Sequence, residues 1–232
     1  MTEPTFQQAL GTTGSATSAL ALPSMSTTTG RFLIVTASHY TVGVSISSVT
    51  DTAGNTYSKA GTTQGGDANQ DNECWYTASP ITGNASNVVS INFSDTAQFQ
   101  LGSVSEWSHP TATGLSFDAE SAHAMSNGTT LASGSVSTSA ADGLLIGQWV
   151  AFDDPETLSN GTGTVMWQQN AGGVDDAASA YRIVGAAGSY TIDITSANDS
   201  AGTDNYSTIA KAFTFTTGGG GGGNNTSAWI TA

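Results

Sequence analysis

Short stretches in which apolar and polar residues alternate constrain the fold of this chain more than any other feature. Residues 89–94 read Val-Ser-Ile-Asn-Phe-Ser, and residues 190–195 repeat the pattern as Tyr-Thr-Ile-Asp-Ile-Thr. A period of two places successive side chains on opposite faces of a strand. No window of eleven residues has the apolar spacing of an amphipathic helix. The pattern therefore predicts an all-β protein.

Other segments have the length and turn chemistry of strands. The continuous apolar runs 32–35 and 144–150 indicate central strands that are covered on much of both faces. Gly54 and Asn55 tolerate a positive φ, so 46–60 is predicted to be a hairpin. The remaining predicted strands are 73–79, 99–107, 130–138, 164–169, 178–184 and 207–216.

The composition favours exposed strands over helices. Ser and Thr account for 65 of 232 residues, whereas charged residues make up only 9%. Few Glu, Lys or Arg side chains are left to solvate helices, and Thr suits a pleated, half-buried surface. Many short strands, each with one apolar face to bury, indicate an antiparallel two-sheet sandwich of the jelly-roll or immunoglobulin-like type.

The ends of the chain differ from its middle. Residues 1–20 are predicted to be either a first strand or an arm, and 21–217 the β-sandwich domain. The glycines 218–223 make a flexible linker to a C-terminal tail, 224–232. Trp229 and Ile230 are an apolar pair in this tail, so we expect them either to contact a partner or to fold back on their own sandwich.

Charge excludes two classes of partner. Four Lys and Arg residues stand against 18 Asp and Glu residues. Nucleic acid and anionic membrane surfaces both require clustered basic residues, so neither is an expected partner. Glu3 stands where a signal peptide would be basic, and no run of 18 apolar residues occurs. A virion component, a substrate of signal-less secretion, and a mature fragment with a new Met all remain open.

No pattern of a catalytic or metal site is present. Cys74 is the single cysteine, which we expect to be a small buried residue, and His39, His109 and His123 lack metal-ligand spacing. Nucleophile-elbow, P-loop and dinucleotide motifs do not occur. We therefore predict a non-enzymatic protein without a cofactor or metal.

Two sets of acidic residues are weak candidates for a catalytic or calcium site. Glu106 with Asp118 or Glu120 would make an acid/base pair, but Glu106 shares a strand face with Val104 and is expected to be a carboxylate satisfied by a neighbour. The segment 153–156, Asp-Asp-Pro-Glu, and the pair 175–176, Asp-Asp, are expected to be acidic turns, with calcium as the alternative.

Aromatic residues offer a possible carbohydrate platform. Trp75 and Trp167 have polar or acidic neighbours and are the candidate glycan contacts, because sugar rings stack on exposed aromatic faces. Trp107 and Trp149 lie in apolar strands and are expected to be interior.

Five segments resemble, in the same order, a group of β-sandwich domains that is found in bacterial surface proteins and in phage virion proteins. These segments are 47–57, 87–93, 103–107, 133–136 and 181–190. The resemblance spans about residues 20 to 217 and implies a sandwich fold and display on a surface. It carries no catalytic residues.

From these features we expect a phage virion structural protein, such as a capsid decoration, fibre or other surface component. It would bind a capsid or tail protein and form a homo-oligomer at the virion surface. The alternatives are an extracellular carbohydrate-binding or adhesin module, and a subunit of an extracellular filament joined by strand donation.

Overall fold

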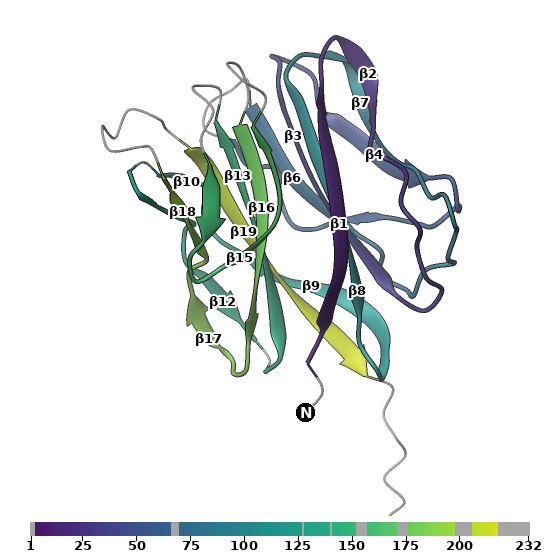
Figure 1. The fold of residues 1–232 in the computed structure, drawn as a ribbon, viewed down its shortest axis with the longest axis vertical. Helices are drawn as coiled ribbons and strands as arrows, with labels where there is room; N and C mark the ends of the chain where they lie inside the picture. Colours follow the sequence, from purple (N-terminus) through teal and green to yellow (C-terminus); the bar gives the residue numbers. More distant parts are fainter. Residues whose placement is uncertain are drawn as a thin grey trace, which may run out of the picture.

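The structure, a computed structural model, describes residues 3–65, 70–126, 128–139, 141–151, 157–170, 176–197 and 206–217, with 170 and 176 described by their backbone alone. These residues form strands and connecting loops without a helix, and none of them belongs to a helix long and apolar enough to cross a membrane. The predicted all-β, antiparallel sandwich is confirmed. Figure 1 shows two such sandwiches side by side.

The N-terminal lobe is a sandwich of two antiparallel sheets. We call the sheet with order β1-β8-β3-β6-β5 the N-inner sheet and the sheet with order β2-β7-β4 the N-outer sheet. The strands are β1 (Thr5–Gly14), β2 (Thr17–Ala21), β3 (Phe32–Tyr40), β4 (Ile46–Asp51), β5 (Ser58–Lys59), β6 (Gln70–Tyr76), β7 (Val89–Ala97) and β8 (Gln100–Ser108). This order, with the first and last strands adjacent, is that of a jelly roll. Leu33, Val49 and Ile91 belong to the apolar core between the two sheets.

The C-terminal lobe begins after residues 109–111. Its C-inner sheet has the order β10-β19-β13-β16-β15, and β9 also pairs with β19. Its outer layer consists of β11-β18-β14 and β12-β17. The strands are β9 (Ala112–Glu120), β10 (Ala124–Ser126), β11 (Thr130–Ala132), β12 (Val136–Thr138), β13 (Gly143–Ala151), β14 (Leu158–Asn160), β15 (Thr164–Asn170), β16 (Asp176–Val184), β17 (Gly188–Tyr190), β18 (Asp193–Ser196) and β19 (Tyr206–Thr217).

The two lobes repeat one topology. Strands β9 with β10, β19, β13, β16 and β15 take the places of β1, β8, β3, β6 and β5, and β11-β18-β14 takes the place of β2-β7-β4. The isolated bridge Met25↔Asn87 corresponds to the pair Val136↔Tyr190 of β12 and β17. The chain therefore contains the jelly roll twice, although its sequence shows no strict internal repeat.

The inner sheets pack face to face, which gives four layers in all. The contacts are symmetric: the rings of Trp107 (β8) and Tyr181 (β16) lie 5.0 Å apart at 80°, and those of Phe213 (β19) and Tyr76 (β6) lie 5.4 Å apart at 64°. Since β8 corresponds to β19 and β6 to β16, each pair is the counterpart of the other. The lobes thus meet as two subunits of a dimer meet about a twofold axis.

The interface between the inner sheets changes character along the strands. One part is apolar and aromatic, including Phe32, Ile146 and Leu115. The middle carries hydroxyl groups: Ser103 Oγ lies 2.8 Å from Thr36 Oγ1 of the same sheet and 2.9 Å from Ser179 Oγ of the other sheet. All of these side chains are buried. The interface is therefore built like a protein core, and with a linker of only residues 109–111 it joins the lobes into one body.

The structure decides two of the strand predictions. The segment 1–20, predicted to be a first strand or an arm, contains β1, which pairs with β8 over Thr5–Gly14, and the start of β2. The predicted hairpin over 46–60 is wrong, because β4 pairs with β7 in the N-outer sheet and β5 pairs with β6 in the N-inner sheet. The turn at 51–55 forms, since Asp51 Oδ1 accepts a hydrogen bond from Asn55 N, but the chain then crosses to the other sheet.

Candidate functional site

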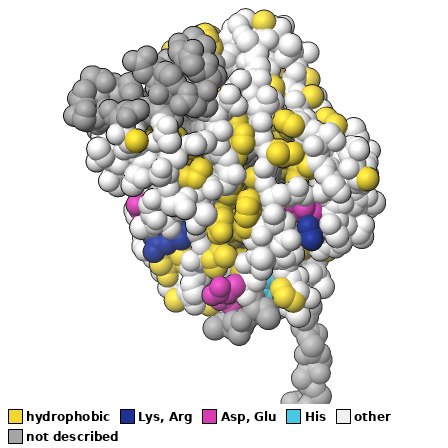
Figure 2. Space-filling view, in the orientation of Figure 1, with side chains coloured by type: hydrophobic (Ala, Val, Ile, Leu, Met, Phe, Trp, Pro, Cys, Tyr) yellow, Lys and Arg dark blue, Asp and Glu magenta, His cyan; other side chains and the backbone are white. Residues whose placement is uncertain are grey.

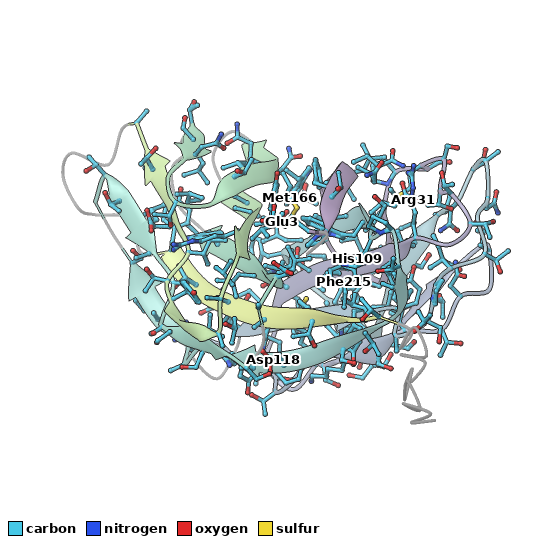
Figure 3. All side chains as sticks on the ribbon, turned by 90° about the horizontal axis from the view of Figure 1, so that it is seen from below. Glu3, Arg31, His109, Asp118, Met166 and Phe215 are labelled. Carbon is cyan, nitrogen blue, oxygen red and sulfur yellow. The ribbon has the colours of Figure 1, made fainter. Side chains whose placement is uncertain are left out.

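Glu106 is a buried structural carboxylate. It is fully buried, and its oxygens accept hydrogen bonds from Gln8 Nε2 at 2.6 Å, Thr28 N at 2.8 Å and Arg31 Nη1 at 3.1 Å. Figure 3 places Arg31 far from Asp118. The expectation that a neighbour satisfies Glu106 is confirmed, and an acid/base pair with Asp118 is not formed.

Two further ion pairs, each with one buried partner, hold the edges of the inner sheets. Glu73 lies 2.5 Å from Lys59 Nζ and accepts a hydrogen bond from Trp75 Nε1 at 2.8 Å. Glu120 pairs with the buried Lys211 and accepts a hydrogen bond from Thr62 N at 3.0 Å. Burial pushes the pKa of Glu120 upward, but the bonds from Lys211 and Thr62 outweigh burial and leave this pKa below its usual range. Glu120 is therefore a structural ion-pair partner.

The histidines and the cysteine do not form a metal site. His39 Nε2 lies 3.4 Å from Asp71 Oδ2, His123 Nε2 lies 2.9 Å from Ser207 Oγ, and His109 stacks on Phe215 (Figure 3). Among the described residues no three His, Cys, Asp or Glu side chains are grouped to hold a metal. Cys74 is buried, as expected, and burial raises the pKa of its thiol to about 12.

The four tryptophans of the described strands divide into two kinds. Trp107 and Trp149 are fully buried, which confirms the expectation that they are interior. Trp75 and Trp167 are half-buried: Trp75 packs against the N-terminal core, and Trp167 packs against Leu101 in the interface between the lobes. The two candidate glycan contacts thus belong to different clusters and do not form one platform. Trp229, Ile230, 153–156 and Asp175 lie outside the described residues, and Asp176 is described by its backbone alone.

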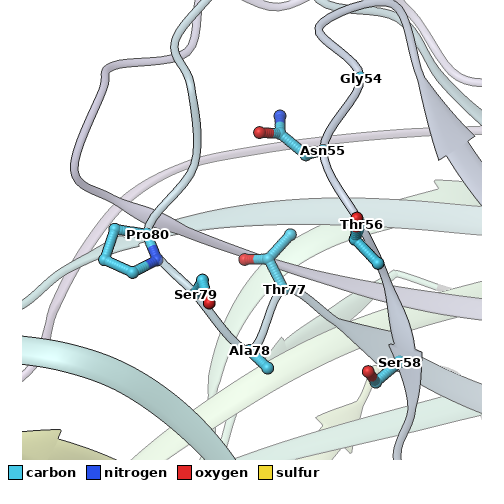
Figure 4. A pocket seen from close by; sticks show the side chains of 8 residues that line it. All are labelled: Gly54, Asn55, Thr56, Ser58, Thr77, Ala78, Ser79 and Pro80. Carbon is cyan, nitrogen blue, oxygen red and sulfur yellow. The ribbon is translucent and has the colours of Figure 1, made fainter.

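The candidate binding site is a cleft at the end of the N-terminal lobe, shown in Figure 4. It has a volume of about 310 Å³ and lies between 54–58, around the start of β5, and 77–80, directly after β6. Ser58 pairs with Tyr76, and beyond this pair the two segments diverge. The lining side chains are neutral and small, namely those of Asn55, Thr56, Ser58, Thr77, Ala78, Ser79 and Pro80.

One wall of the cleft rests on a carboxylate. Asp51 accepts hydrogen bonds from Asn55 N and Nδ2 at 2.9 and 2.8 Å, from Tyr57 Oη at 3.0 Å and from Asn87 Nδ2 at 3.0 Å. Burial pushes the pKa of Asp51 upward, but these hydrogen bonds outweigh burial and hold the pKa below its usual range. Asp51 is therefore an anion that neutral donors stabilise.

Sequence reasoning treated 51–55 as a hairpin turn and 73–79 as a strand, and so missed the cleft that they form. The available signal was Pro80, which ends a ladder because it has no N–H to donate. The structure also shows that the floor of the cleft is tied to the other lobe, since Ala78 O accepts a hydrogen bond from Leu115 N of β9 at 3.0 Å.

Comparisons with known proteins add little. No protein-family model and no curated protein matches the chain. Among solved structures, oxalate decarboxylase from Bacillus subtilis is similar at 7% identity, over 91% of this chain and 74% of that one, with a TM-score of 0.19. A similarity at this level carries no argument about fold or function.

Proposed function

We propose that the chain is a non-enzymatic structural protein of a phage virion, a capsid decoration or another surface or fibre component. The observation that carries the proposal is the duplicated jelly roll, fused into one body through an interface built like a core. Jelly rolls are the common building units of viral capsids, and they also occur in lectins and cupins. A particle surface needs units that keep their shape under lateral contact, and a four-layer body with a short linker meets this need.

The other two jelly-roll classes fit the described residues less well. A cupin-type site needs metal ligands inside the sandwich, whereas both interiors here are filled by apolar clusters. A lectin with a stacking platform needs exposed aromatic faces, whereas Trp75 and Trp167 are half-buried in separate clusters. These observations favour the structural role over the carbohydrate-binding alternative.

The surface supports an assembly role. On the face in Figure 2, hydrophobic side chains run along the line between β1 and β15, where the lobes meet, and charged side chains are few. Partly buried apolar residues at this interface include Phe6, Met166 and Ile183. An apolar strip on a face with few charged side chains suits contact with another protein.

Particle association tests the proposal. Virions from the producing culture would be purified, examined by electron microscopy with an antibody against this chain, and analysed by mass spectrometry. The expected result is regular labelling of the particle surface and a fixed copy number per particle. A chain that stays in the particle-free fraction as a dispersed monomer would refute the virion role.

Strand exchange is a second candidate mode of assembly, favoured by the position of β1. This strand of ten residues lies at the edge of the N-inner sheet, where it pairs with β8 alone. An edge strand can leave its own sheet and complete that of a neighbour. A variant that lacks 1–14 and a free peptide of these residues test this mode. If strands are exchanged, the peptide should block assembly of the full chain.

A further inference from the structure

The pseudo-twofold relation between the lobes allows them to be compared position by position. Tyr76 pairs with Ile34 and Tyr181 pairs with Ile146, in corresponding strands of the two inner sheets. Each tyrosine also makes the same edge-to-face contact with an aromatic ring of the other lobe. The two tyrosines are therefore equivalent, and so are the residues that follow them, Thr77 and Arg182.

In the C-terminal lobe, Arg182 closes the end of the sandwich. Its Nη1 donates a hydrogen bond to Thr191 O at 2.7 Å, in the segment between β17 and β18. Its guanidinium lies over the ring of Tyr190, 5.3 Å from the centroid. A cation over an aromatic face is attracted by the negative charge density of the ring. One arginine thus bridges the inner sheet and the outer layer.

In the N-terminal lobe, the equivalent position has a short side chain beside an open cleft. Thr77 is buried, and its Oγ1 accepts a hydrogen bond from Leu33 N at 3.0 Å, so it cannot reach the outer sheet. Thr77 also lines the cleft of about 310 Å³. The cleft therefore lies beside the position from which the other lobe extends an arginine side chain.

The carboxylate of Asp51, which is bonded to the lining residue Asn55, attracts cations. Asn87 is the counterpart of Tyr190, and its Nδ2 donates a hydrogen bond to Asp51 Oδ2 at 3.0 Å. The N-terminal lobe thus has an amide bonded to a carboxylate where the C-terminal lobe has an aromatic ring. Both the carboxylate and the ring stabilise a guanidinium.

Asp51 also differs from the glutamates that form ion pairs, two of them buried and one partly buried. Glu73, Glu106 and Glu120 are each paired with a Lys or Arg, whereas the hydrogen-bond donors to Asp51 are the neutral groups of Asn55, Tyr57 and Asn87. All four Lys and Arg residues of the chain are described, and each is bonded within the chain. The chain's own Lys and Arg side chains are therefore engaged elsewhere and do not supply a cation to this site.

We infer that the cleft at 54–58 and 77–80 binds an arginine side chain of a partner protein, in the place that Arg182 fills in the C-terminal lobe. The partner is a protein with an exposed arginine and not a second copy of this chain, whose arginines are engaged. The inference goes beyond the virion role, because it names the chemistry of a contact that does not depend on where the protein is displayed.

Titration with a minimal ligand tests the inference. N-acetyl-arginine amide is added to the ¹⁵N-labelled full chain, and N-acetyl-citrulline amide serves as the neutral isostere. We expect saturable amide shifts at 54–58 and 77–80, with citrulline binding about two- to fivefold more weakly, the range for a solvent-accessible charge pair. Equal binding of citrulline, or no saturable shift at these amides, would overturn the inference.

Three variants locate the site. Thr77→Arg places the guanidinium in cis, as in the C-terminal lobe, and should abolish the shifts. Thr96→Arg adds the same charge to an exposed position of β7 and should leave binding unchanged. Asp51→Asn should bind arginine no better than citrulline. Wild-type binding by a folded Thr77→Arg protein, or by Asp51→Asn, would contradict the assigned place and partner.

Discussion

The two aromatic contacts between the inner sheets predict two equal coupling energies. Trp107 with Tyr181, and Phe213 with Tyr76, are counterparts at centroid distances of 5.0 and 5.4 Å. An edge-to-face pair contributes about 0.5–1.5 kcal/mol beyond the burial of its area. Replacing each ring by Leu keeps the position apolar, so that a double-mutant cycle isolates the ring–ring contact. We expect about 1 kcal/mol in both cycles.

The single variants are expected to cost more than the coupling. Trp107 is fully buried, and it also contacts Phe6 and donates a hydrogen bond from Nε1 to Ser105 Oγ at 2.9 Å. Truncation of a buried Trp to Ala costs about 3–5 kcal/mol, and Leu leaves part of this volume filled. Trp107→Leu should therefore lower the free energy of unfolding substantially while the fold persists.

Urea unfolding followed by circular dichroism measures all the variants. A cycle between Trp107 and Tyr190 is the control, because Tyr190 lies on β17 in the outer layer of the other lobe, and its coupling should stay within the error of about 0.5 kcal/mol. Coupling in one aromatic cycle but not in the other would refute the symmetric interface. No coupling in either cycle would refute packing of the inner sheets through these rings.

Three further predictions concern stability. Gly11→Ala should destabilise the protein by about 1–3 kcal/mol, because a Cβ there would lie 2.3 Å from the Trp167 ring and 2.6 Å from Gly102 O, whereas Gly185→Ala, with open space, should be neutral in the same thermal melt. Arg31→Met should cost about 3–5 kcal/mol in urea unfolding, since it leaves the Glu106 carboxylate buried without its cation, and adding Glu106→Gln should restore part of this loss; a cost below about 1 kcal/mol would contradict a buried ion pair. Burial lowers the pKa of His39, so the unfolded chain binds the proton more readily, and the free energy of unfolding should fall from pH 7.5 to about 5.5; His39→Gln should flatten this dependence, and an unchanged slope would exclude His39 as its source.

The fold class was predictable because the strands either alternate regularly or are covered on both faces. Segment 89–93 alternates, and in β7 its apolar residues face the N-terminal core while the polar ones face outward. The runs 32–35 and 144–150 are continuous because β3 and β13 lie in the inner sheets, which have a second sheet on either face. These patterns depend on burial alone, and burial is what hydropathy reports.

The hairpin error and the missed duplication have a common cause. Local turn chemistry at 51–55 fixes a reversal but does not decide which strand β4 pairs with, since that depends on partners far away in sequence. Equivalent positions of the two lobes also differ in chemistry, as Thr36 and Gln148 do on the central strands. The two lobes share a strand arrangement and a filled core, which different side chains can provide equally well. The duplication is therefore not visible as a repeat in the sequence.

In a duplicated fold, residues that both lobes need for their shared structure can be distinguished from residues that serve a function in one lobe. Tyr76 and Tyr181 occupy the same place and make the same contact, because both lobes need the interface. The next residues differ: Arg182 closes its lobe, whereas Thr77 leaves a cleft beside the carboxylate of Asp51. Since the shared structure tolerates both residues, stability does not require the opening. A site grafted on a shared fold is expected at such a difference, and this places the contact with a partner at the end of the N-terminal lobe.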